Sequence, residues 1–257
     1  MFPRKFHICD ACGIPIYLDF SFLILMIVFL MDFRSFSLGL ACVTMLALSI
    51  TLHELGHSLT ARAFGYRTRD ITLSLLGGCA ALCALPRKAW QEFLTAAAGP
   101  AVSFALSALA FAMTLFAPIP TEWLYCVVTY TWVMNLILGV FNLLPGFPMD
   151  GGRIFRSALR AFMSRAKATY VAMIVGRITA VGLALYGVWR IHATGTYGWI
   201  TLLIAWMIWR EGYREYQLAK MEERWGFDDP RQWSATVSSP PYSDDDDEDV
   251  DVRRGGR

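Results

Sequence analysis

The sequence predicts an all-α, polytopic membrane protein with about six transmembrane helices and a small re-entrant β-hairpin between the second and third. Of its 257 residues, 56% are hydrophobic and 17% are charged, whereas about 25% of the residues of a soluble domain are charged. The first four-fifths of the chain contain long charge-free runs, such as Leu38–Ile50. Apolar runs of about 18 residues or more are typical of membrane spans.

The apolar runs place six spans along the chain. We expect them at about Ile14–Met31, Leu38–Phe64, Trp90–Phe116, Trp123–Leu144, Tyr170–Ile191 and Tyr197–Tyr213.

A different pattern follows the second span. From Asp70 to Leu75 polar and apolar residues alternate, which puts Ile71, Leu73 and Leu75 on one face. This period of two predicts a short strand or hairpin, with Gly77-Gly78 as its turn. A strand at membrane depth is tolerated only inside the protein or in a wet cavity, so we expect a re-entrant hairpin.

Basic residues indicate the orientation of the spans. The segments before the first span, between the second and third, and between the fourth and fifth carry Arg4, Lys5, Arg62, Arg67, Arg69, Arg87, Lys88, Arg153, Arg156, Arg160, Arg165 and Lys167. The opposite loops hold only Arg34 and Arg190. Because basic residues favour the cytosolic side, both termini are expected in the cytosol.

Three regions are therefore expected: a cytosolic N-terminal segment (1–13), a membrane-embedded domain (14–216) and a cytosolic, acidic, disordered tail (217–257). The tail contains the run SDDDDEDVD, and such polar, charged segments do not bury enough apolar surface to fold. The net charge of +2 averages a basic body and this tail, and it gives no case for nucleic-acid binding. We expect a multi-pass protein of the cell membrane in contact with lipid.

The stretch TLHELGHSLT places two histidines and a glutamate in the cytosolic third of the second span. On a helix His53 and His57 share one face, a spacing that allows two imidazoles to bind one zinc ion. Glu54 is rotated by about 100° and can reach a metal-bound water, whose pKa zinc lowers to about 7. Charged groups at membrane depth are costly and mark functional sites.

A catalytic zinc usually has three protein ligands. His7, His192 and Asp19 are weaker candidates by position, and Asp150 in FNLLPGFPMDGGRIFRSALR is the best. Pro145, Gly146 and Pro148 end the preceding helix, and Gly151-Gly152 would let the backbone turn sharply, which brings Asp150 to the depth of the histidines. Alternatively, Asp150 is an N-cap of the next helix.

The chain resembles the site-2 protease family, whose members are intramembrane zinc metalloproteases. The resemblance rests on four motifs between about residues 13 and 215, namely GIPIYLDFSF (13–22), HELGHSLTARAFG (53–65), PRKAWQEFLTAAAGPAVSF (86–104) and NLLPGFPMDGGR (142–153). It implies one Zn²⁺ per chain bound by His53, His57 and Asp150, with Glu54 as the general base.

The resemblance also implies that Asn142 stabilises the oxyanion, although an interhelical hydrogen bond is the alternative. Two features depart from the family. Ser103 stands where many members have Asn, and it still offers a hydroxyl. Many members of the related subgroup end in a paired nucleotide-sensing domain, which we expect this chain to lack because about forty residues follow the last span.

The expected activity is hydrolysis of a peptide bond in the transmembrane segment of a single-span protein. By resemblance that substrate is an anti-sigma factor or a membrane-tethered regulator. Gly77 and Gly78 would allow the substrate to approach the edge of the hairpin closely and to bind there as an extended strand. Alternatively, the hairpin is a structural element that shields the zinc. The alternatives are a membrane-anchored metalloprotease that cuts soluble or misfolded proteins, and a metal transporter or catalytically silent scaffold.

Overall fold

The computed structural model describes residues 5–31, 33, 35–74, 77–82, 86, 88–194 and 198–224. In chain order its elements are β1 (Lys5–Ala11), β2 (Ile14–Asp19), α1 (Phe20–Met31), α2 (Phe36–Ala63), β3 (Thr68–Ser74), β4 (Gly77–Leu82), α3 (Ala89–Phe116), α4 (Glu122–Asn142), α5 (Asp150–Leu159), α6 (Arg165–Thr194) and α7 (Gly198–Arg224). Four residues named above, Arg4, Arg34, Leu75 and Arg87, and the acidic run lie outside the described residues.

Among the described residues, four helices are long and apolar enough to cross a membrane, namely α2, α3, α4 and α6. They correspond to the second to fifth predicted spans. The first and sixth spans are not confirmed. Helix α1 has 12 residues, which is about 18 Å of helix and shorter than the apolar core of a bilayer of about 30 Å. In α7 the apolar part ends at Trp209, because Arg210 and Glu211 follow.

The N-terminal sheet corrects the all-α prediction. Residues Ile14–Asp19, which were expected to begin a helical span, form β2 instead. Strands β1 to β4 make one sheet in the order β1-β2-β3-β4, in which β2 and β3 are parallel and the outer pairs antiparallel. Alternation along β2 buries Ile14 and Ile16, and Pro15 lies between them. That period of two was readable in the sequence, but the run was interpreted as the start of a span.

Two hairpins connect neighbouring strands of the sheet. The β1–β2 turn is Cys12-Gly13, whose φ angles of 55° and 76° are both positive, as in the type I′ turns that favour two-residue hairpins. The strands predicted between α2 and α3 are present as the antiparallel pair β3–β4. The prediction that Gly77-Gly78 forms the turn is wrong, because both glycines lie in β4, where Gly77 pairs with Ser74 and Gly78 with Leu73.

Hydrophobic packing fixes the sheet against α2. Ile14, Ile16 and Ile71 pack with Leu55 of α2, and Leu73 packs with Ile50 and Phe22. Asp70 of β3 accepts hydrogen bonds from Arg69 and Thr72 of the same strand, and Lys5 of β1 reaches this group, since its Nζ lies 3.6 Å from Oδ2 of Asp70. Burial alone would raise the pKa of Asp70, but these bonds hold it below its ordinary value. Asp70 and Thr72 are thus bonded to each other.

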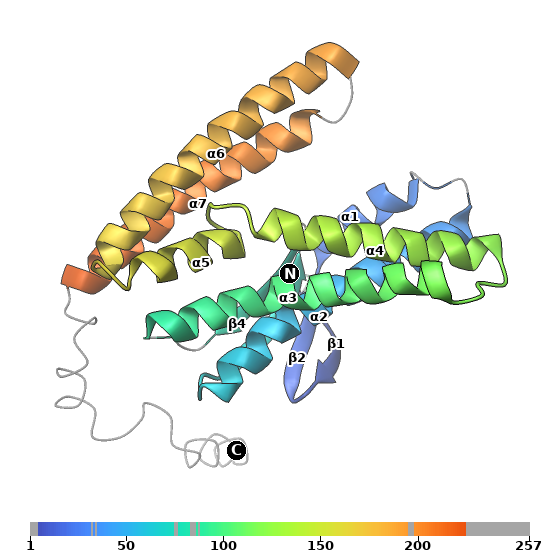
Figure 1. Cartoon of the computed structure of the whole chain (residues 1–257), viewed down its shortest axis with the longest axis horizontal. Helices are drawn as coiled ribbons and strands as arrows, with labels where there is room; N and C mark the ends of the chain where they lie inside the picture. The colour runs from blue at the N-terminus through green and yellow to red at the C-terminus, as the bar shows by residue number, and fades with distance from the viewer. Residues whose placement is uncertain are drawn as a thin grey trace, which may run out of the picture.

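The helices form two groups (Figure 1). Helices α2, α3 and α4 pack against one another, and α6 and α7 form a separate hairpin. The short helix α5 contacts α3 on one side and α6 on the other. Helix α5 therefore lies where the two groups meet, and it begins with Asp150.

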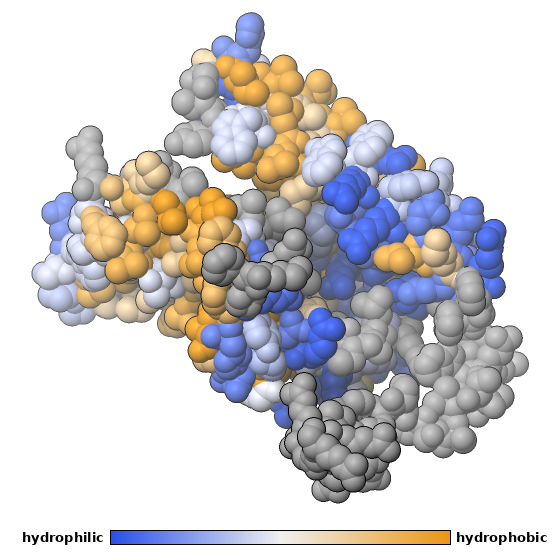
Figure 2. All heavy atoms as spheres, turned by 180° about the vertical axis from the view of Figure 1, so that it is seen from behind, coloured by the Kyte–Doolittle hydropathy of each residue, from blue (hydrophilic) through white to orange (hydrophobic). Residues whose placement is uncertain are grey.

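The surface supports a multi-pass membrane protein. In Figure 2 apolar side chains gather over the upper end of the α6–α7 hairpin, and hydrophilic ones over the right side, where α6 begins and α7 ends. Ile178, Leu185 and Trp189 of α6 are all more than half exposed. Such a band of exposed apolar residues is expected where helices face lipid.

Candidate metal centre

Helix α2 presents His53 and His57 one turn apart on a buried face. Both side chains are almost fully buried, and their Nε2 atoms lie 3.2 Å apart. The helix forms because its residues are apolar over several turns, and its period brings positions i and i+4 together. The local sequence therefore accounts for this half of the site.

Asp150 completes the site from a distant part of the chain. Its Oδ2 lies 3.1 Å from Nε2 of His53 and 3.1 Å from Nε2 of His57. Among the described residues, His53, His57 and Asp150 are the one group of three that could hold a metal ion.

The spacing of the three ligand atoms fits zinc. Two ligands about 2.0–2.1 Å from a zinc ion, at a tetrahedral angle, lie about 3.3 Å apart. The three observed separations are 3.1, 3.1 and 3.2 Å. Two imidazoles and one carboxylate also leave a fourth position open, as a catalytic zinc site requires.

The local structure around Asp150 corrects the predicted backbone. Gly151 and Gly152 do not make a sharp turn, because both lie in the first turn of α5, whose N-cap is Met149. Their missing side chains serve close packing instead. A Cβ on Gly151 would lie 2.3 Å from the carbonyl oxygens of Leu143 and Leu144. Helix α5 can therefore approach the end of α4 closely enough to bring Asp150 to the histidines.

Helix α3 orients both imidazoles from behind. Nδ1 of His53 lies 2.9 Å from Oγ of Ser103, and Nδ1 of His57 lies 2.7 Å from the carbonyl oxygen of Thr95. When each Nδ1–H donates to these oxygens, each Nε2 is left with its lone pair toward Asp150. Such partners of metal-binding histidines fix the tautomer and the ring orientation.

Replacing Ser103 with alanine is expected to weaken zinc binding by about 10-fold or more, because His53 loses its Nδ1 partner. The measurement is zinc affinity of the purified full chain by competition with a chelator. Ser107→Ala is the matched control, since Ser107 is also buried on α3 but donates to the carbonyl of Trp132. Equal affinities of the two variants would contradict the role of Ser103.

Gly99 of α3 lies against the histidine pair. A Cβ at this position would be 2.2 Å from Nε2 of His57 and 2.7 Å from Nε2 of His53. The motif that ends in Gly-Pro was recognised in the sequence, but the reason for its glycine was not. The glycine lets the backbone of α3 touch the rings of α2.

Glu54 is buried beneath strand β4. Its Oε2 accepts a hydrogen bond of 3.2 Å from the backbone N–H of Ala80, and a Cβ on Gly78 would lie 2.2 Å from Cγ of Glu54. Gly78 therefore allows β4 to cover the glutamate closely. Gly77 lies at the start of the same strand, paired with Ser74.

Other candidate residues are placed elsewhere. The amide of Asn142 donates to the carbonyl of Leu138 in its own helix, so its proposed catalytic role stays a prediction. His7 pairs with Asp10, and Asp19 accepts from the backbone of Ser21. Neither belongs to the metal-binding group of the described residues, and nor does His192.

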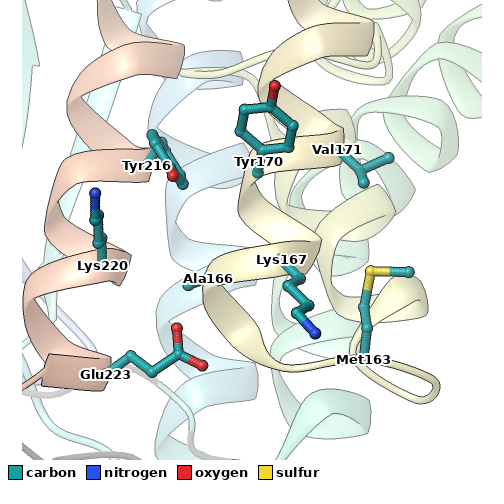
Figure 3. A pocket seen from close by; sticks show the side chains of 8 residues that line it. All are labelled: Met163, Ala166, Lys167, Tyr170, Val171, Tyr216, Lys220 and Glu223. Atoms are coloured by element: carbon teal, nitrogen blue, oxygen red, sulfur yellow. The ribbon is translucent and has the colours of Figure 1, made fainter.

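A hollow of about 520 Å³ lies away from this site, between α6 and α7. Figure 3 shows Lys167 and Tyr170 of α6 on one side and Tyr216 and Lys220 of α7 on the other. Its lining includes none of the candidate zinc ligands.

Known proteins that are similar to this chain include zinc metalloproteases. The model of peptidase family M50 matches residues 41–119 and 119–185. A zinc metalloprotease of Methanocaldococcus jannaschii is 34% identical over 177 residues, which cover 68% of this chain and 51% of the relative. Rip3 of Mycobacterium tuberculosis, whose name describes a zinc metalloprotease, is 37% identical over 182 residues, or 69% of this chain and 46% of the relative.

The fold is also similar to that of a solved protein. The structure of a site-2 protease from Methanocaldococcus jannaschii superposes with a TM-score of 0.62 at 30% sequence identity, covering 82% of this chain and 95% of the other. The chain spans about half the length of the two curated relatives above. The family match extends over more than half of the chain and includes both histidines and Asp150. The chain therefore belongs to peptidase family M50, the family of the site-2 proteases.

Proposed function

We propose that this protein is an intramembrane zinc metalloprotease that hydrolyses a peptide bond in the transmembrane segment of a single-span protein. The observation that carries the proposal is the convergence of His53, His57 and Asp150 within 3.2 Å of one another, with buried Glu54 next to them in the chain. Burying three ionisable groups together is costly unless they bind a common cation.

His53, His57 and Asp150 would hold one zinc ion per chain. When bound, zinc would lower the pKa of a water to about 7 and polarise the scissile carbonyl. Glu54 is the general base that takes the proton of the attacking water and returns it to the leaving amine. The bond from Ala80 holds one oxygen of Glu54, which limits the motion of its carboxylate. Asn142 is proposed to donate to the developing oxyanion.

The substrate must be unwound before it is cut, because a transmembrane helix shields its carbonyls within its own hydrogen bonds. Strand β4 is an outer strand of the sheet and lies against Glu54. We propose that a segment of the substrate adds to this edge as a further strand, with Gly77 and Gly78 allowing its close approach.

The proposed location is the cell membrane, with both termini in the cytosol. The basic residues on one side of the spans support this orientation. In this arrangement residues 14–216 form the membrane-embedded protease domain, flanked by cytosolic segments 1–13 and 217–257. The proposed substrate is an anti-sigma factor or another membrane-tethered regulator, whose release from the membrane would change its activity.

Replacing Asp150 with asparagine is expected to remove both zinc and activity. A neutral amide is a poorer zinc ligand than a carboxylate, so bound zinc should fall from about one per chain to near zero. Metal content of the purified full chain and cleavage of a tagged single-span substrate in vesicles are the measurements. Asp10→Asn, a change in exposed strand β1, is the matched control. Full zinc retention by the Asp150 variant would contradict the three-ligand site.

A further inference from the structure

A buried cluster of charges lies beside the candidate metal centre, and the proposed chemistry does not use it. The side chain of Arg156, on α5, is 1% exposed. Its Nε and Nη2 donate to Oε1 of Glu92 at 2.8 and 2.6 Å, and its Nη1 donates to Oε2 of Glu215 at 2.8 Å. Arg160 donates to the other oxygen of Glu92 at 2.6 Å. In the sequence, both arginines indicated only the orientation of the membrane spans.

The partners of Arg156 belong to the elements that build the metal site. Glu92 lies on α3, one turn before Thr95, whose carbonyl orients His57. The guanidinium also lies over the ring of Phe147, 4.9 Å from its centroid, and Phe147 is buried in the segment that leads into Asp150. Arg156 therefore links the segment that carries Asp150 to α3, the helix that orients the imidazole of His57.

The element that carries Asp150 needs such an anchor. Helix α5 has ten residues, and a helix of that length is marginal without tertiary contacts. Asp150 is its first residue, where a small shift of the helix moves the carboxylate away from the imidazoles. Metal sites tolerate little displacement, since ligand distances must agree within about 0.2 Å.

We propose that Arg156 is a positioning residue that holds Asp150 at the metal site, through its contacts with Glu92 and Phe147. Glu215 of α7 supplies the outer contact of the same guanidinium, so the α6–α7 hairpin contributes to the pose of Asp150. This inference rests on the proposed zinc site but not on the identity of the substrate. Arginine suits the role because its planar fork binds two carboxylates at once, which a lysine ammonium does not reproduce.

The decisive variant is Arg156→Lys, which keeps the positive charge but loses the planar guanidinium that donates to two carboxylates. We expect its zinc affinity, measured by chelator competition on the purified full chain, to fall, but by no more than the 10–100-fold typical for loss of a direct hydrogen-bond partner of a metal ligand. The cobalt-substituted variant should show weaker visible absorption bands, because loss of the Asp150 ligand changes the coordination of the metal. Zinc should also raise the melting temperature of the variant less than that of the wild type.

Two further variants separate positioning from a general structural role. Glu222→Gln removes the charge of Glu222, which lies 3.2 Å from Arg165 between α6 and α7, without changing α5, and its zinc affinity should equal that of the wild type. Glu215→Gln removes only the charge of the outer partner of Arg156, and its zinc affinity should fall less than that of Arg156→Lys. If Arg156→Lys does not fold, the zinc affinity of Glu215→Gln tests the positioning role instead.

The outcomes distinguish this inference from the proposed function. Wild-type protein that binds no zinc through His53, His57 and Asp150 would overturn both. Wild-type protein that binds zinc, with a folded Arg156→Lys variant whose zinc affinity and cobalt spectrum are unchanged, would overturn the positioning role alone. An unchanged zinc affinity in Glu215→Gln, where Arg156→Lys does not fold, would do the same.

Discussion

Glu54→Gln protein is expected to keep its zinc and to lose peptide hydrolysis. Glutamine has nearly the same shape, and its amide oxygen can still accept the hydrogen bond from Ala80, but the amide does not take up the proton of the attacking water. Loss of a positioned general base costs about 10²–10⁴-fold in rate. Zinc per chain and the cleavage rate of a tagged single-span substrate, both measured on full-length protein, check this expectation.

A matched control and a cellular readout complete this experiment. Glu122→Gln makes the same chemical change in the exposed first turn of α4 and should leave both zinc and cleavage at wild-type values. In membrane proteomes, cells with Glu54→Gln protein should accumulate an uncut single-span protein, which would identify the substrate. Undiminished cleavage by the variant would rule out Glu54 as the base. A metal transporter or a silent scaffold predicts that the variant retains full function.

Gly99→Ala is expected to destroy the metal site although it removes no ligand. The new methyl group would lie 2.2 Å from Nε2 of His57 and 2.4 Å from its Cε1, a separation at which the ring must move. His57 has little freedom to move, because its Nδ1 is bonded to the carbonyl of Thr95 on the same helix as Gly99. Zinc affinity should therefore fall by at least the 10–100-fold that is typical for loss of an orienting partner.

The same substitution elsewhere provides the control for Gly99. Gly182 lies in α6, and a Cβ there would meet nothing within 4 Å. Gly182→Ala should raise the free energy of unfolding by about 0.5–1 kcal/mol, because alanine restricts the unfolded chain, and should leave zinc affinity unchanged. Chelator competition and thermal unfolding measure the two quantities. If Gly99→Ala binds zinc as tightly as Gly182→Ala does, the close approach of α3 to the histidines is not required.

Much of the helical framework could be predicted from the sequence because it depends on local properties. The apolar runs that become α2, α3, α4 and α6 must satisfy their backbone groups within each segment, and a helix does so. The pair His53 and His57 is equally local, since the helical period alone puts both on one face. These features require no knowledge of how distant segments pack.

The sheet and the first span show where local patterns were insufficient. Strand β2 and helix α1 form one apolar stretch in the sequence, which favoured a single long helix. Strand β2 forms instead because β1 folds back on it and β3, more than fifty residues later, pairs beside it through residues such as Ile16 and Ile71. Pairing with a distant strand is not encoded in the stretch itself, so the composition of that stretch did not reveal it.

The sequence by itself determined the four spans that become α2, α3, α4 and α6, and the two imidazoles with the glutamate beside them, because each depends on residues within one helix. Tertiary structure alone decided that Asp150 meets the histidines, that Gly99 must lack a side chain, and that Ser103 and Thr95 orient the rings. It also placed Arg156, which the sequence indicated only as a basic residue near a membrane surface, in a buried ion pair with Glu92. The physical reason is that contacts between helices depend on their relative placement, which no single segment specifies.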